Sequence, residues 1–247
     1  MPKIFSHLLN ILFPPKCVFC GGMMEPGADG FICRRCRRNL PYTAEHICCA
    51  RCGKPVASFG EKKLCADCMK APPRFVRCVS ALEYTGNVRR SVLKFKNGKP
   101  EYAKTYAELL AVVVGAMYGG VNFDALVAAP ISPKRLKRRG YDQTARLSAE
   151  ISARTGIPYI PGVLEKIRET PPQSSLNRNL RETNLNGAFR AAKADKIAGK
   201  TLLSVDDVMT TGSTLNECAK VLKAAGAKDV YAVTLATTAK RPPQKFQ

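Results

Sequence analysis

The sequence predicts an α/β protein in which a small cysteine-rich module precedes a larger domain built on a parallel sheet. Eight of the 11 cysteines stand in four Cys-x-x-Cys pairs near the start, and from residue 71 onward short apolar stretches alternate with helical ones. Such alternation is typical of parallel βαβ units, whose sheet is covered on both faces. The 247 residues are enough for one such domain and one module. We expect a helix over 1–15, the module over 16–70 and the α/β domain over 71–247.

The first half of the α/β domain is predicted to hold one strand and two helices. Pro72 marks its start, directly after the last cysteine pair. Residues 75–84 are rich in β-forming residues and predict a strand. Residues 87–95 and 101–118 predict helices, which an Asn-Gly-Lys-Pro breaker at 97–100 separates.

In the second half, three strands alternate with two helices. The strands are expected over 125–129, 201–205 and 230–235, and the helices over 146–155 and 215–225, each followed by a glycine. Parallel sheets bind ligands beyond the carboxyl ends of their strands. The segment after 201–205 is therefore the first place to look for a site.

The four cysteine pairs predict two structural zinc sites. Two residues between cysteines let both thiolates of a pair bind one ion, and two pairs complete a tetrahedral four-thiolate site. Because no coordination position stays open, these sites are expected to be structural rather than catalytic. In a module with little apolar content, the metal would supply much of the folding free energy. The eight predicted zinc ligands are Cys17, Cys20, Cys33, Cys36, Cys49, Cys52, Cys65 and Cys68.

The spacing alone does not decide which pairs share an ion, because successive pairs start 16 residues apart throughout. Gly21 and Gly53 follow the first and third pairs, where a knuckle turn favours a residue that tolerates positive φ. The resulting 32-residue repeat favours two consecutive ribbons, in which the first pair joins the second and the third joins the fourth. His46 and Cys48 stay open as substitute ligands.

Residues 1–15 are expected to form an amphipathic helix that docks on the rest of the protein, with a membrane anchor as the less favoured alternative. Polar residues interrupt their apolar ones and no small-residue cleavage site follows, unlike a secretory signal. No apolar run in the chain reaches the roughly 18–20 residues that cross a bilayer. We expect a cytoplasmic protein without an integral membrane segment, in which the thiols stay reduced.

Residues 201–214 predict a phosphate-binding loop. The apolar strand runs into two adjacent acids and then into small residues that open a helix. N–H groups and hydroxyls at a helix N-terminus stabilise a phosphate, and the acids can accept hydrogen bonds from vicinal ribose hydroxyls. The alternative is a plain strand–helix junction with Thr214 as N-cap and solvated acids. The predicted ligands of a sugar 5-phosphate are Asp206, Asp207, Thr210, Thr211, Gly212, Ser213 and Thr214.

This segment resembles the 5-phosphoribosyl-1-pyrophosphate (PRPP) signature of type I phosphoribosyltransferases, apart from Ser204 at a normally apolar strand position. Further motifs are Phe-Pro-Pro-Lys-Cys at 13–17, Leu-Lys-Phe-Lys at 93–96, Arg-Gly-Tyr-Asp-Gln at 139–143, an Arg-x-Thr motif over 168–176 and an Arg-x-x-Asn motif over 181–189. They extend the resemblance over essentially the whole chain, to the ComF family, whose commonest form has Asn in place of Asp142.

The resemblance implies a double zinc ribbon joined to a type I phosphoribosyltransferase-like domain. It also implies a competence protein, since ComF proteins are linked to bringing incoming single-stranded DNA into the cytoplasm during natural transformation, beside a helicase-like partner. The alternative is an active phosphoribosyltransferase, a glycosyltransferase that acts outside competence on an unidentified acceptor. Thr210 stands where the similar hypoxanthine–guanine enzymes carry an aspartate, which disfavours a purine acceptor.

If the protein is an enzyme, the resemblance implies that PRPP binds with Mg²⁺ and that a nucleophile displaces pyrophosphate at the anomeric carbon. The two acids would stabilise the positive charge that develops there. The pyrophosphate is expected beyond the strand 125–129, near Ser132, Lys134 and Arg135. Residues 168–187 are expected to form a mobile hood that excludes water, with an ordinary surface loop as the alternative.

A net charge of +21, from 40 Lys and Arg against 19 Asp and Glu, predicts a polyanionic partner. The cations form clusters near aromatic residues that can stack on bases, which favours single-stranded DNA over plain solvated faces. Part of the charge must serve PRPP, itself a polyanion. The predicted nucleic-acid contacts are Arg89, Arg90, Lys94, Lys96, Lys137, Arg138 and Arg139.

Overall fold

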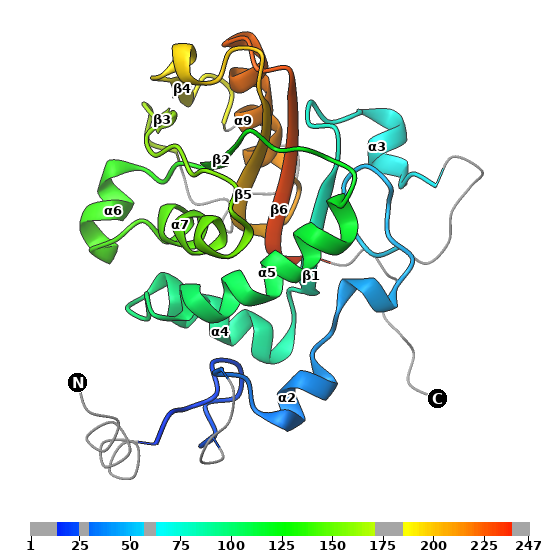
Figure 1. Ribbon diagram of the computed structural model, residues 1–247, viewed down its shortest axis with the longest axis vertical. Helices are drawn as coiled ribbons and strands as arrows, with labels where there is room; N and C mark the ends of the chain where they lie inside the picture. The colour runs from blue at the N-terminus through cyan, green and yellow to red at the C-terminus, as the bar shows by residue number, and fades with distance from the viewer. Residues whose placement is uncertain (1–13, 25–29, 57–62, 171–184, 239–247) are drawn as a thin grey trace.

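The computed structural model describes residues 14–24, 30–56, 63–170 and 185–238 (Figure 1). The predicted helix over 1–15 lies almost entirely outside these residues. Most of the predicted hood over 168–187 also lies outside them, since residues 171–184 are not described.

A four-stranded, fully parallel sheet forms the centre of the α/β domain, in the order β1-β6-β5-β2 (Figure 1). The register pairs Ala125 of the edge strand with Leu202, and Leu202 with Val230. These three side chains are fully buried, as expected of a parallel sheet covered on both faces. The strands are β1 (Cys78–Glu83), β2 (Ala125–Ala128), β5 (Thr201–Met209) and β6 (Asp229–Thr237).

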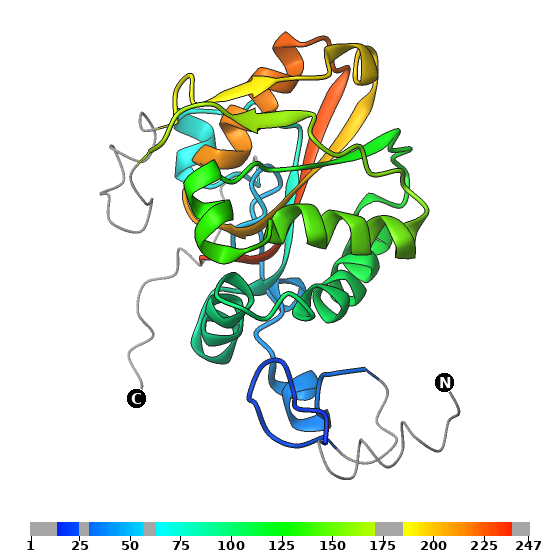
Figure 2. The same ribbon diagram turned by 90° about the vertical axis from the view of Figure 1, so that its left-hand side faces the viewer.

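Helices cover both faces of this sheet (Figures 1 and 2). Successive residues of a strand point to opposite faces, so Leu203 packs in the hydrophobic cluster under three helices and Leu202 in the cluster under the fourth. The three are α4 (Gly86–Lys96), α5 (Tyr102–Tyr118) and α7 (Gln143–Thr155), and the fourth is α9 (Ser213–Ala224). Among the described residues, no helix is both long and apolar enough to cross a membrane.

Strand β5 is four residues longer than the predicted 201–205 and includes both acids. Asp206 pairs with Thr234 and Met209 with Thr237 of β6. Backbone pairing with β6 therefore continues beyond the last apolar residue of the predicted strand. The two acids lie at the end of the strand rather than in the loop after it.

Two helices begin at least two residues earlier than predicted. Helix α7 begins at Gln143 because Asp142 caps it: its Oδ1 accepts from the N–H groups of Thr144 and Ala145, both at 2.9 Å. Helix α9 begins at Ser213, with Gly212 as N-cap. The alternative with Thr214 as N-cap is therefore wrong.

The sequence did not predict several short elements of the α/β domain. The basic run at 134–139 lies in a helix that Ser132 caps, since its side chain accepts from the N–H of Arg135 at 3.4 Å. Two short strands pair antiparallel and form a second, small sheet. The bounds are α6 (Pro133–Arg139), β3 (Leu164–Lys166), β4 (Phe189–Ala191) and the 3-10 helix η3 (Ala194–Lys196).

The cysteine pairs gather into two groups of four, and the sulfur atoms of each group lie within 4.8 Å of one another. The first group holds the pairs that start at Cys17 and Cys33, and the second those that start at Cys49 and Cys65, which confirms the favoured pairing. His46 and Cys48 belong to neither group. The ribbons also carry α2 (Arg34–Asn39), the 3-10 helix η1 (Thr43–Glu45) and α3 (Ala66–Lys70).

Each ribbon packs on a different part of the α/β domain. In the first, the carbonyl of Val18 accepts a hydrogen bond from the Ser91 hydroxyl of α4 at 2.6 Å. In the second, the carbonyl of Arg51 accepts from the N–H of Cys78 at 2.8 Å. Gly53, with φ +67°, lies so close to the start of β1 that a Cβ on it would sit 2.4 Å from the carbonyl oxygen of Cys78. A side chain at this knuckle would force the ribbon off β1.

Candidate functional site

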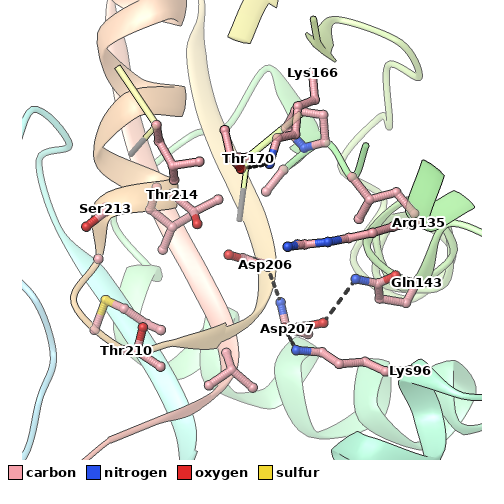
Figure 3. A pocket seen from close by; sticks show the side chains of 18 of the residues that line it. Lys96, Arg135, Gln143, Lys166, Thr170, Asp206, Asp207, Thr210, Ser213 and Thr214 are labelled. Atoms are coloured by element: carbon pink, nitrogen blue, oxygen red, sulfur yellow. Dashed lines mark hydrogen bonds and ion pairs between the residues drawn. The ribbon is translucent and has the colours of Figure 1, made fainter. Parts of the chain in front are cut away.

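A cavity of about 220 Å³ lies at the carboxyl end of β5, the edge at which parallel sheets bind ligands (Figure 3). Strand β5 contributes its two acids, the loop before α9 contributes hydroxyls, and α4, α6 and β3 contribute basic side chains. The ionisable, amide and hydroxyl side chains in its wall include Lys96, Arg135, Arg139, Gln143, Lys166, Thr170, Asp206, Asp207, Thr210, Ser213 and Thr214.

Asp207 is buried and both of its carboxylate oxygens have partners. Its Oδ1 pairs with Nζ of Lys96 at 2.8 Å, and its Oδ2 accepts from Nε2 of Gln143 at 3.2 Å (Figure 3). Lys96 ends α4 and Gln143 begins α7, so three elements meet at this carboxylate. Oε1 of Gln143 is buried and has no hydrogen-bond partner among the described residues. A ligand hydroxyl in the cavity would satisfy it.

Asp206 has different surroundings. Burial and the neighbouring Asp207 carboxylate raise the pKa of Asp206 to about 7, although the Lys96 charge acts in the opposite direction. Its Oδ1 accepts the N–H of Asp207 at 2.8 Å. Near neutral pH this carboxyl is therefore present in both protonated and ionised forms, so it can donate as well as accept hydrogen bonds with hydroxyl groups.

The loop that follows β5 turns the chain into α9. Gly212 has φ +88°, a conformation that side-chain-bearing residues rarely adopt. The first N–H groups of a helix have no intrahelical partner and carry its positive dipole end, so the start of α9 favours an anion here. Of the five loop residues in the predicted phosphate site, Thr210, Gly212, Ser213 and Thr214 line the cavity. Thr211 is not among the lining residues, and its hydroxyl hydrogen-bonds to that of Ser213 at 2.7 Å.

The three residues predicted to face a pyrophosphate have separate positions. Arg135 lines the cavity, Ser132 is buried at the start of α6, and Lys134 is exposed outside the lining. The N–H of Lys134 donates to Oε1 of Glu169 at 3.3 Å, and the Ser132 hydroxyl also hydrogen-bonds to this carboxylate. A carboxylate therefore occupies the donors at the start of α6, where the sequence predicted an anion.

Lys166 is a cavity residue that the sequence did not reveal. Its Nζ donates to Oγ1 of Thr170 at 2.6 Å (Figure 3). Burial, followed by the repulsion of Arg135, lowers the pKa of Lys166 to about 8, so the side chain is mostly a cation at neutral pH. Its one sequence signal is a position just before the motif that begins at Arg168.

Two of the seven predicted nucleic-acid contacts line the cavity. Lys96 pairs with Asp207, and Arg139 lines the wall, where its Nε is buried without a hydrogen-bond partner among the described residues. The other five are exposed and do not line this cavity: Arg89, Arg90 and Lys94 on α4, and Lys137 and Arg138 on α6.

Both cysteine groups have the donors and the spacing of a structural zinc site. The sulfur atoms of Cys20 and Cys33 lie 3.8 Å apart, and those of Cys52 and Cys65 lie 3.7 Å apart. Thiolates about 2.3 Å from one tetrahedral ion would be roughly 3.8 Å from each other. Four sulfur donors in each group leave no open position for a substrate.

Two protein families match the chain. A double zinc ribbon domain matches residues 8–69, and a phosphoribosyl transferase domain matches residues 101–246, more than half of the chain. The DNA utilization protein YhgH of Salmonella typhimurium is 33% identical over 175 residues, which cover 69% of this chain and 76% of that protein. Competence protein F of Haemophilus influenzae is 34% identical over 114 residues, 46% of this chain and 50% of that protein. The chain belongs to the ComF family.

Another ComF relative is competence protein ComFC of Streptococcus pneumoniae, 38% identical over 109 residues, 44% of this chain and 46% of that protein. The two proteins named for competence thus match this ComF chain over about half of their length. Among solved structures, glutamine PRPP amidotransferase from B. subtilis is 23% identical, with a TM-score of 0.37 over 55% of this chain and 26% of its own. The assignment of the fold therefore rests on the family match and on the parallel sheet described above.

Proposed function

We propose that this ComF protein binds PRPP or ribose 5-phosphate in the cavity and assists the uptake of single-stranded DNA during natural transformation. The observation that carries the proposal is the meeting of a carboxylate pair, a helix-start loop and four basic side chains in one cavity. PRPP presents vicinal hydroxyls and several anionic groups, which complement such a lining. The names of the relatives, competence protein F, ComFC and DNA utilization protein, support the part in DNA uptake.

Each part of the cavity has a role in this proposal. The loop 210–214 holds the 5-phosphate, the two acids of β5 hold the ribose hydroxyls, and Arg135 and Lys166 balance the pyrophosphate charge. Lys96 holds the Asp207 side chain in place through their ion pair at 2.8 Å. The carboxylate oxygens at this edge suit a hard cation, and Mg²⁺ bound with PRPP would neutralise part of the pyrophosphate charge.

An active phosphoribosyltransferase is the second candidate. The carboxylates of Asp206 and Asp207 would stabilise positive charge at the anomeric carbon while the remaining contacts hold the substrate in place. Acceptor-dependent release of pyrophosphate from PRPP by the purified protein would support transfer. PRPP binding without such release would support a role in which the bound sugar phosphate regulates DNA handling.

We also propose that each four-cysteine group holds one structural Zn²⁺, because its four thiolates complete a closed tetrahedral site.

In the proposed role in DNA uptake, a helicase-like competence protein would act in the cytoplasm on the same incoming single strand of DNA. Exposed cations outside the cavity, such as Lys94 of α4, would contact that strand. DNA binding in a gel-shift assay should therefore survive loss of the acids of β5.

The proposal is tested by a transformation assay in a competent host whose own copy of the gene is deleted. The strain is complemented with wild-type protein, with the double variant Asp206→Asn/Asp207→Asn, or with Asp195→Asn. Asp195 is an exposed acid that does not line the cavity, so its substitution is a matched control. We expect the double variant to transform no better than the deletion strain, and the control to transform as wild type. Full rescue by the double variant would separate the cavity from DNA uptake.

A further inference from the structure

A second cavity of about 810 Å³ lies between the first ribbon and the junction of α4 with α5, and we call it the ribbon groove. Its walls come from four parts of the chain: the first ribbon, the end of α4 with the turn that follows it, the first turn of α5, and α7. None of these residues lines the first cavity, at the carboxyl end of β5. The groove is therefore a separate site.

The ribbon groove is strongly basic. Five cations line it, and Glu101 is the one acid among the described lining residues. Glu101 pairs with Lys99 at 3.5 Å, but both side chains are more than half exposed, so the pair is weak in water. A net positive charge therefore remains for an anionic ligand. The cations are Lys16, Lys94, Lys99, Lys104 and Arg146.

The groove also offers an aromatic ring and a hydroxyl without a partner. Phe31 of the first ribbon lines the groove and is 45% exposed, so a base can reach its ring. Thr105 of α5 is fully buried, and its Oγ1 has no hydrogen-bond partner among the described residues. Proteins that bind single-stranded nucleic acid combine an exposed aromatic ring, which stacks on a base, with basic side chains along a groove, which contact the phosphates.

We infer that the ribbon groove binds single-stranded DNA, with phosphates on its lysines and a base stacked on Phe31. The identity of the ligand rests on the proposed function, whereas its location rests on the groove itself. A duplex is a poorer fit, because its bases are stacked on one another and leave no face free for the ring. Of the exposed cations that the sequence predicted as DNA contacts, Lys94 belongs to this groove, while the others lie outside it.

The experiment is a titration of a fluorescently labelled oligothymidylate with the full chain, followed by fluorescence anisotropy at several salt concentrations. The groove variant is Lys99→Ala/Lys104→Ala. Its matched control is Lys137→Ala/Arg138→Ala, which removes the same charge from exposed positions of α6 outside the groove. Zinc content and PRPP affinity of each variant report whether the protein is still folded.

We expect the groove variant to bind about tenfold or more weakly. The slope of log affinity against log salt should fall by about 1.4, from about 0.7 for each lost phosphate contact of a single strand. Phe31→Leu should weaken binding by roughly tenfold without changing that slope, because one stacked base is lost and no charge is removed. The α6 control should keep the wild-type slope.

Three outcomes would overturn the inference. If the α6 control loses affinity and the groove variant does not, DNA binds on the outer face and the proposed function still stands. If a duplex binds as tightly as the single strand and loses as much in the groove variant, the groove is a general polyanion site. If the wild-type protein binds no oligonucleotide, the groove assignment and the DNA part of the proposed function fail together, whereas PRPP binding is unaffected.

Discussion

Asp206 and Asp207 are neighbours in β5, yet the fold treats their charges differently. Asp207 pairs with Lys96 and accepts a hydrogen bond from Gln143, whereas burial and the neighbouring Asp207 raise the pKa of Asp206 to about 7. An acid whose pKa is higher in the folded state binds its proton more tightly there than in the unfolded chain. Its contribution to the free energy of unfolding is therefore largest at low pH and is lost as the pH rises from about 4 to about 7.

Asp206→Asn should therefore stabilise the protein above neutral pH. The amide carries no charge to desolvate, so the free energy of unfolding should rise by on the order of 1–3 kcal/mol at pH 8. The gain should shrink as the pH falls toward 5, where folded Asp206 is itself protonated. Denaturant unfolding of the wild type and of Asp206→Asn between pH 5 and pH 8 checks this prediction. A gain that is independent of pH, or a loss at pH 8, would contradict the assigned pKa.

Lys166 gives a prediction for ligand affinity rather than stability. Its pKa of about 8 means that the free protein loses this positive charge between neutral pH and pH 9. The charged groups that face it are Arg135, Arg168 and Glu169. Because PRPP is an anion, we expect its dissociation constant to rise by up to about tenfold over that range. Lys166→Arg, which stays charged, should show a flatter profile when PRPP binding to both proteins is measured by calorimetry over this pH range. Identical profiles would exclude Lys166 as a ligand.

At the scale of elements, the two knuckle glycines differ in what surrounds them. Both have positive φ, but a Cβ at Gly53 would meet the Cys78 carbonyl oxygen at 2.4 Å, whereas one at Gly21 would come no closer than 3.9 Å, to the flexible end of Lys94. Gly21→Ala should cost about 1 kcal/mol, the strain of a left-handed alanine. Gly53→Ala should cost about 3 kcal/mol or more, because the second ribbon must leave β1. Equal losses in denaturant unfolding would contradict the docking of the second ribbon.

The order and type of the long elements followed from local pattern, since apolar periodicity and breakers are properties of neighbouring residues. The elements that the sequence missed depend on distant partners. Strand β5 extends through its acids because β6 lies alongside, and β3 forms because β4, more than 20 residues later, pairs with it. The early start of α7 could have been predicted from the sequence, because Asp142 is a typical N-cap residue and stands directly before Gln143, the first residue of the helix.

The residues of the candidate site likewise include some that local sequence predicts and others that depend on distant parts of the fold. The loop and both acids are contiguous in the chain and were predicted, as were the eight cysteines. The sequence alone assigns Lys96 and Arg139 to basic surface clusters. Nothing in the adjacent sequence indicates that the end of α4 and helix α6 both lie beside a buried carboxylate. The only local signal for Lys166 is its position just before the motif that begins at Arg168, because its role depends on the fold that brings β3 against the cavity.

At the scale of the whole molecule, the two ribbons are part of the core rather than appendages. Cys17 and Cys36 pack in the same hydrophobic cluster as α4, α5 and α7. Cys49 and Cys68 pack in the cluster on the other face of the sheet, with residues of α9. Loss of metal from either ribbon should therefore loosen the packing on one face of the sheet.

Metal analysis of the purified protein should find two zinc ions per chain. Removing them with a strong chelator should lower the Tm of the α/β domain itself by roughly 10 °C or more, since a loss of 1 kcal/mol shifts Tm by about 2–4 °C in a protein of this size. The domain's own transition can be followed through the circular dichroism of its helices. An unchanged Tm after complete removal would contradict the shared core.

The central claim is that the cavity at the end of β5 is a PRPP site, and isothermal titration calorimetry with PRPP and Mg²⁺ tests it most directly. The account predicts saturable binding to the wild-type protein and to Asp195→Asn. For Asp206→Asn/Asp207→Asn it predicts affinity at least about 100-fold weaker, from the loss of two hydrogen-bonding carboxylates worth roughly 1.5–3 kcal/mol each. Unchanged affinity in the double variant, at a folding transition like that of the wild type, would contradict the claim.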